Sequence, residues 1–175
     1  HIAENHILPH KERFSDPVFL ARVADRTARA RLNPVGSVAT DLRLQNPEGK
    51  ELSLSEVESP LTVLYFFNPG CSACQPITDR LIRNYNLYKS RGMEVFAVYL
   101  ERDKEVWNDY IVSKKLTWVN VFDPTGQEMV EEKYDIYALP MIYVLDRDKR
   151  VIARDVSAER LSNFILGRES TIPKQ

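Results

Sequence analysis

The sequence predicts an α/β fold, a three-layer α/β/α sandwich in which a mixed sheet lies between two layers of helices. An unbroken apolar run over residues 61–67 indicates a buried central strand, and a helical repeat of apolar residues follows it from Ile77. A second apolar run over residues 93–100 completes a strand–helix–strand unit, whereas the chain ends with two strands and a helix. The first arrangement is typical of parallel strands and the last of antiparallel strands. Together they predict a mixed sheet that is covered on both faces.

Length and composition are those of a globular domain with an appendage. The chain has 175 residues, of which 43% are hydrophobic and 28% are charged, and it is long enough to bury a core. Its net charge of -1 gives no electrostatic basis for nucleic-acid binding, and no apolar stretch approaches the roughly 20 residues that span a bilayer. Because the chain begins at His1 without an initiator methionine or a signal peptide, we expect a processed or trimmed form.

Residues 1–33 are expected to form a helical segment that packs on the main domain or is left over from a larger one. The stretch Ser15-Asp16-Pro17 is a good helix start, with Asp16 as the N-cap and Pro17 in the first turn. The face expected to pack on a core consists of Phe19, Val23 and Ala24. The other face consists of Arg22, Arg26 and Arg29, and it is either solvated or a binding site for an anionic partner.

All three histidines, His1, His6 and His10, lie in this same segment. Their spacing suits neither one helical face nor a known ligand pattern, so no metal site is expected. Because no histidine follows His10, a Cys–His dyad or a Cys/His zinc site would need the segment to fold back over Cys71.

The main domain is expected to begin after a linker at residues 33–36 and to open with a β-hairpin. Alternating segments at residues 38–44 and 50–54 flank a turn at residues 46–49. The helix after Cys71 should end near Gly92, which is placed as a C′ glycine. Asp103 is expected to cap the next helix, whose apolar face consists of Val106, Trp107, Tyr110 and Ile111. A strand at residues 118–122, a helix at 128–134 and strands at 141–145 and 150–154 follow. Ser157 is expected to cap the last helix, which Gly167 ends.

The only two cysteines, Cys71 and Cys74, lie where the strand at residues 61–67 gives way to this helix. There is no other cysteine to bridge to, and so short a loop gains little stability from a crosslink. A zinc site is also disfavoured, because two thiolates lack two further ligands nearby in the sequence. The pair is therefore explained better by reactivity than by stability.

The order of these elements resembles the thioredoxin fold, with Cys-x-x-Cys at a helix start and an X-Pro before the last hairpin. The hairpin before Leu61 and the inserted helix and strand with Trp107 and Trp118 are similar to those of envelope thiol-disulfide oxidoreductases of the TlpA/ResA kind. Closer still is the resemblance to Bacteroidetes envelope lipoproteins in which a helical domain precedes a thioredoxin module. Its signatures are Phe67-Asn-Pro-Gly-Cys71 and Tyr134-Asp-Ile-Tyr-Ala-Leu-Pro-Met-Ile-Tyr-Val-Leu-Asp146.

This resemblance implies a thiol-disulfide oxidoreductase without a cofactor or a metal. Its partners would be a protein thiol or disulfide substrate and an upstream redox partner. Residues 1–33 would be the tail of the helical domain, and residues 36–167 the thioredoxin-like domain. The implied location is the bacterial cell envelope, with attachment to the membrane only through a lipid that this chain lacks.

Position predicts a different role for each cysteine. A thiolate at Cys71 would lie at the positive end of the helix, which lowers a thiol pKa and makes an attacking nucleophile. Cys74, one turn inside, should be the buried resolving thiol that closes the Cys71–Cys74 disulfide and releases the product. Pro140 is implied to be the cis-proline beside the cysteines. The expected substrate contacts are Leu139, Pro140, Pro69 and Gly70.

Several positions depart from the family pattern. Tyr65 stands where thioredoxins have a buried Asp, and Ile77 where many TlpA-like reductases have a Glu, so neither usual proton acceptor for Cys74 is present. Gly70 replaces a common Trp and leaves the site open. A peroxiredoxin is disfavoured because Asn68 occupies the place of a required Thr. The alternative to an oxidoreductase is a redox-inert thioredoxin-like binding or scaffold module.

Overall fold

The fold is that of a computed structural model, in which residues 3–14 and 16–167 are described. Its strands are β1 (Arg43–Gln45), β2 (Glu51–Ser53), β3 (Leu61–Phe67), β4 (Met93–Tyr99), β5 (Val119–Phe122), β6 (Met141–Asp146) and β7 (Val151–Arg154). Its helices are α1 (Pro17–Ala30), α2 (Cys74–Tyr88), α3 (Lys104–Lys114), α4 (Val130–Lys133) and α5 (Leu161–Ile165). Shorter helical turns lie at Ala3–Ile7, Leu8–Arg13, Leu54–Glu56 and Lys89–Arg91.

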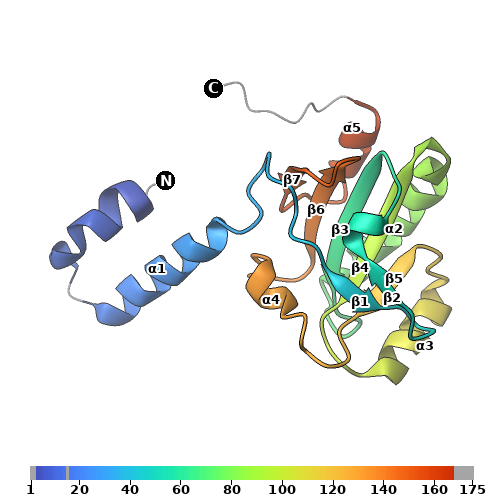
Figure 1. Ribbon diagram of the computed structural model, residues 1–175, viewed down its shortest axis with the longest axis horizontal. Coiled ribbons are helices and arrows are strands. Elements are labelled where there is room, and N and C mark those ends of the chain that lie inside the picture. The colour runs from blue at the N-terminus through green and yellow to red at the C-terminus, as the bar shows by residue number, and fades with distance from the viewer. Residues whose placement is uncertain (1–2, 15, 168–175) are drawn as a thin grey trace.

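The strands form one mixed sheet in the order β2-β1-β5-β4-β3-β6-β7 (Figure 1). β3 pairs in parallel with β4 and antiparallel with β6, so it has a strand on each side. The crossover through α2 explains the parallel β3–β4 pair. β6 also pairs antiparallel with β7, to which a short turn joins it. The mixed sheet expected from the sequence is confirmed.

β3 is buried on both faces because its alternate side chains enter two separate cores. Val63, Tyr65 and Phe67 pack under α2, α3 and α5. Leu64 and Phe66 pack on the other face of the sheet, against α4 and the chain around β1 and β2. The apolar run in the sequence therefore reflects two layers of packing, which confirms the three-layer sandwich.

The N-terminal hairpin is shorter than the sequence predicts, because β1 begins only at Arg43. The chain before it pairs elsewhere: the N–H of Ala39 donates to the carbonyl of Lys149 at 2.8 Å, and Val38 bridges to Arg150. Hydrogen bonds also hold the expected linker against the domain. Asn33 is buried, its Nδ2 donates to the carbonyl of Lys133 at 2.8 Å, and its Oδ1 accepts from the N–H of Thr40 at 2.7 Å.

Two helix predictions need correction. Val106 is 46% exposed and does not join the buried face of α3, which Trp107 and Tyr110 form. Ser157 does not cap the last helix: its carbonyl accepts the N–H of Arg160 in a turn, and α5 begins after Arg160 without a side-chain cap. The Asp103 cap is confirmed, with its Oδ1 accepting from two backbone N–H groups at 3.1 Å.

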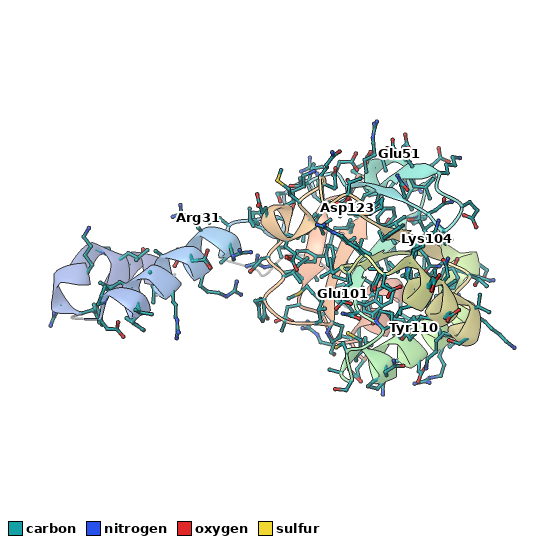
Figure 2. The ribbon with its side chains drawn as sticks, turned by 90° about the horizontal axis from the view of Figure 1, so that it is seen from below. Arg31, Glu51, Glu101, Lys104, Tyr110 and Asp123 are labelled. Atoms are coloured by element: carbon teal, nitrogen blue, oxygen red, sulfur yellow. The ribbon has the colours of Figure 1, made fainter. Side chains whose placement is uncertain are left out.

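The N-terminal helices project from the domain and do not pack on its core (Figure 1). The Asp16 cap is confirmed by its contact with the N–H of Val18 at 2.9 Å, whereas Ser15 lies outside the described residues. α1 has no buried residue, and Phe19 is 40% exposed, so the expected apolar contact with a core is wrong. Figure 2 shows the same separation from below, with Arg31 near the junction.

Arginines, not apolar residues, hold the end of α1 against the domain. Arg26 forms an ion pair with the buried carboxylate of Asp135, and its guanidinium lies 4.2 Å from the centre of the Tyr137 ring. Arg29 donates to the carbonyl of Glu131 at 3.0 Å. Two of the three arginines that we considered for an anionic partner are thus engaged within the chain.

His6 and His10 lie in the short helical turns, whereas His1 lies outside the described residues. In residues 3–14 and 16–167, no three His, Cys, Asp or Glu side chains gather as a metal site would require. None of the helices in these ranges is both long and apolar enough to cross a membrane.

Candidate functional site

A tight turn between β3 and α2 positions the two cysteines. The N–H of Cys71 donates to the carbonyl of Asn68 at 3.0 Å, and the N–H of Gly70 donates to the Asn68 side chain at 2.9 Å. Gln75 fastens the turn from the helix by donating to the carbonyl of Pro69 at 2.8 Å. These bonds place Cys71 just before α2, and Cys74 is the first residue of the helix.

The two thiols are free and differ in exposure. Cys71 is half-buried and Cys74 is completely buried. The Sγ of Cys71 lies 3.7 Å from the carbonyl oxygen of Leu139, to which it donates a weak hydrogen bond. The order of exposure agrees with the roles that position predicts.

The loop before β6 completes the site on the other side of Cys71. The Leu139–Pro140 peptide bond is cis, as the resemblance implies. Leu139 packs against both cores, which fixes the carbonyl that faces Cys71. Cys71 and Leu139 are therefore in contact although they lie 68 positions apart in the sequence.

The surroundings of Cys74 favour its protonated form. Burial, followed by a hydrogen bond with Cys71, raises the pKa of the Cys74 thiol to about 12. A backbone hydrogen bond from Asn68 acts in the opposite direction without reversing the shift. At neutral pH Cys74 is therefore a thiol, which is a poor nucleophile until it loses its proton.

Tyr65, which replaces the expected acid, faces Cys74 with a hydroxyl group. Its Oη lies 2.9 Å from the Oγ1 of Thr78 and 3.4 Å from the carbonyl oxygen of Cys74. Ile77 is partly buried against the apolar core. Sequence reasoning singled out Tyr65 but missed Thr78, although the spacing of four residues from Cys74 places both on one helical face.

The other expected substrate contacts surround Cys71. Pro69 and Pro140 are half-buried and Gly70 is exposed, so the site is open on the side of the turn. Asn68 and Leu139 line a cleft of about 270 Å³. Its remaining lining consists of Leu100, Glu101, Glu131, Ile136, Tyr137 and Ala138.

A family model and several named proteins match this chain. The AhpC/TSA family model matches residues 35–154. The chain is 26% identical over 117 residues to the thiol-disulfide oxidoreductase ResA of Bacillus subtilis, a match that covers 67% of this chain and 64% of that protein. The chain thus spans less than two thirds of that relative.

Solved structures extend this likeness to the fold. A domain of a possible thiol-disulfide isomerase from Cytophaga hutchinsonii is 33% identical, with a TM-score of 0.73 over 77% of this chain and 92% of that one. A thiol:disulfide interchange protein from Bacteroides sp. is 25% identical, with a TM-score of 0.70 over 81% and 93% of the two chains. Proteins named for thiol-disulfide exchange therefore share sequence and fold with this chain, which supports an enzyme of the thiol-disulfide oxidoreductase class.

Proposed function

The chain belongs to the AhpC/TSA family, and on that premise we propose that it is a thiol-disulfide oxidoreductase with Cys71 as nucleophile and Cys74 as resolving thiol. The observation that carries the proposal is the unequal placement of the two sulfurs. Cys71 is accessible beside the Leu139 carbonyl, and Cys74 is buried one turn further along α2.

In the reducing direction, the Cys71 thiolate attacks one sulfur of a substrate disulfide. A mixed disulfide forms, and the other substrate sulfur leaves as a thiolate. Cys74 then loses its proton and attacks the Cys71 sulfur, which closes the Cys71–Cys74 bond and releases the second substrate thiolate. The protein dithiol is oxidised by two electrons and the substrate disulfide is reduced. Oxidation of a substrate would pass through the same mixed disulfide in reverse.

We further propose that an extended segment of a protein substrate binds beside Pro140. The Leu139 carbonyl accepts a weak S–H bond at 3.7 Å, and a substrate N–H would replace this bond at little cost. Pro69 and Gly70 would contact the substrate from the opposite side. Because Gly70 is exposed, the entrance can admit a polypeptide chain.

We place the protein in the bacterial cell envelope, held by a lipid outside this sequence and supplied with electrons by an upstream redox partner. Residues 1–33 would be the tail of a preceding helical domain, and residues 36–167 the catalytic domain. The resemblance to Bacteroidetes envelope lipoproteins supports this placement. Cell fractionation tests it: we expect the native protein with the envelope, and recovery wholly in the cytosol would contradict the proposal.

Reduction of insulin by the full chain in the presence of dithiothreitol tests the activity. We expect the protein to accelerate insulin precipitation and Cys71→Ser to return the rate to that of dithiothreitol alone. A wild-type protein no faster than Cys71→Ser would instead favour a redox-inert binding or scaffold module. The Cys71→Ser variant is a matched control because a hydroxyl replaces the thiol at a half-buried position.

A further inference from the structure

A buried pair of hydroxyl groups lies directly behind the cysteines. The Oη of Tyr65, on β3, is 2.9 Å from the Oγ1 of Thr78, on α2. The same Oη is 3.4 Å from the carbonyl oxygen of Cys74. Tyr65, Thr78 and Cys74 are all completely buried. The hydroxyl pair therefore joins the central strand to the helical turn that contains Cys74.

Packing holds this pair in place. The ring of Tyr65 stacks on Phe67, with 5.2 Å between ring centres and an angle of 8° between their planes. Each hydroxyl satisfies the other in a site without access to solvent, and a buried hydroxyl that lost its partner would carry a desolvation cost. The pair thus fixes the position of the first turn of α2 against β3.

The ionisable groups around Cys74 come from three elements. Cys71 faces it from the turn, Tyr65 from β3 and Tyr110 from α3, where Figure 2 labels Tyr110. Burial raises the pKa of both tyrosines, so both are neutral at neutral pH. The Tyr110 hydroxyl is buried, and Thr78 lowers its pKa against the larger effect of burial.

The nearest charges in this region lie outside the buried set. Lys114 donates to Asp79 at 2.7 Å, and the two act on Tyr110 in opposite directions. Both side chains are partly exposed. Neither tyrosine nor threonine is a base at neutral pH, so the described groups that face Cys74 offer no acceptor for its proton.

We propose that Tyr65 and Thr78 are positioning residues for the resolving step: their paired hydroxyls hold Cys74 next to Cys71 without supplying a base. A mixed disulfide on Cys71 then persists until hydroxide, or the substrate thiolate released in the first step, removes the Cys74 proton. This inference rests on the proposed function. In the step itself, the Cys74–Cys71 bond forms, the Cys71–substrate bond breaks, and the substrate sulfur leaves with the electron pair.

A single-turnover reaction of the reduced full chain with 5,5′-dithiobis(2-nitrobenzoate) tests the inference. Attack by Cys71 releases one coloured thiolate and leaves the other half of the reagent on Cys71. Attack by Cys74 releases the second, so two phases report the two cysteines. Because the departing thiolate is a weak base, we expect the second phase to accelerate about tenfold per pH unit between about pH 6 and pH 9. A second phase that reaches a plateau below about pH 8 would reveal a base and overturn the inference.

Variants test the positioning role. Thr78→Val and Tyr65→Phe each remove one hydroxyl at nearly constant volume, and we expect the second phase to slow by about three- to tenfold while the first is unchanged. Thr78→Ser, which keeps the hydroxyl, should restore the rate. An unchanged second phase in both Thr78→Val and Tyr65→Phe would overturn this inference but not the proposed function. A wild-type protein without a first phase would overturn the proposed function as well.

Discussion

The two sides of the Cys-x-x-Cys motif differ although their cysteines are three residues apart. On the side of Cys71, an exposed turn and the Leu139–Pro140 loop leave a half-buried sulfur beside a backbone carbonyl. On the side of Cys74, the sulfur is buried with the hydroxyls of β3 and α2. The Cys71 side is therefore accessible to a substrate, whereas the Cys74 side excludes water. The difference shows how one helical turn can give two chemically identical side chains separate roles.

The largest expected difference between the two sides is in reactivity. In cells, Cys74→Ser should capture a substrate as a mixed disulfide on Cys71, because no thiol remains to release it. Cys71→Ser should capture none, because Cys74 is completely buried. Non-reducing electrophoresis followed by mass spectrometry measures the captured species. Equal capture by the two variants would contradict the assignment of Cys71 as nucleophile and Cys74 as resolving thiol.

The second expected difference is in stability. Tyr65→Ala should lower the free energy of unfolding by about 3–5 kcal/mol, because it removes a completely buried ring and leaves Thr78 without its partner. Gly70→Ala is the matched change on the open side. Its new Cβ would meet only the Asn68 side chain, at an ordinary 3.5 Å, so a change of no more than about 0.5 kcal/mol is expected.

Urea unfolding of the reduced proteins measures both values. A loss at Gly70→Ala as large as that at Tyr65→Ala would show that the turn is packed as tightly as the buried side. A loss below about 1 kcal/mol at Tyr65→Ala would show that the buried hydroxyl and ring contribute little.

The smallest expected difference is in the pH dependence of stability. Burial raises the pKa of Cys74 from 9.0 to about 12, so the folded protein holds this proton more tightly than the unfolded chain. The resulting stability is fully present below about pH 9 and is lost as the pH rises towards 12, by at most about 1.4 kcal/mol per pH unit.

Reduced wild type and Cys74→Ser, unfolded in urea at pH 8 and pH 10, test this dependence. Comparing the two cancels the titration of lysines and tyrosines that they share. We expect wild type to lose more stability than the variant over this interval. Equal losses would show that Cys74 titrates alike in the folded and unfolded states.

Local patterns in the sequence predict the central elements of the fold. The apolar run of β3, the helical repeat of α2 and the Asp103 cap depend on neighbours within a few residues, and all three are present. Long-range pairing is not visible in such patterns. Asp135 lies 109 residues from Arg26 and Lys133 lies 100 from Asn33, so the contacts of α1 and the fastened linker could not be foreseen.

Sequence patterns likewise predict some residues of the candidate site and miss others. The spacing of Cys71 and Cys74 and the Leu139–Pro140 dipeptide are readable in the sequence, and the structure brings Cys71 and Leu139 together. The partner of Tyr65 was missed because a threonine inside a helix has no distinctive pattern. Only the packing of β3 under α2 shows that the two hydroxyls meet.

Alkylation of the reduced protein, with each cysteine quantified by mass spectrometry, tests the division of roles most directly. Short exposure to iodoacetamide at neutral pH should modify Cys71 and leave Cys74 unmodified until the protein is unfolded. Modification of Cys74 in the folded protein at a rate similar to that of Cys71, or of neither cysteine, would contradict the account.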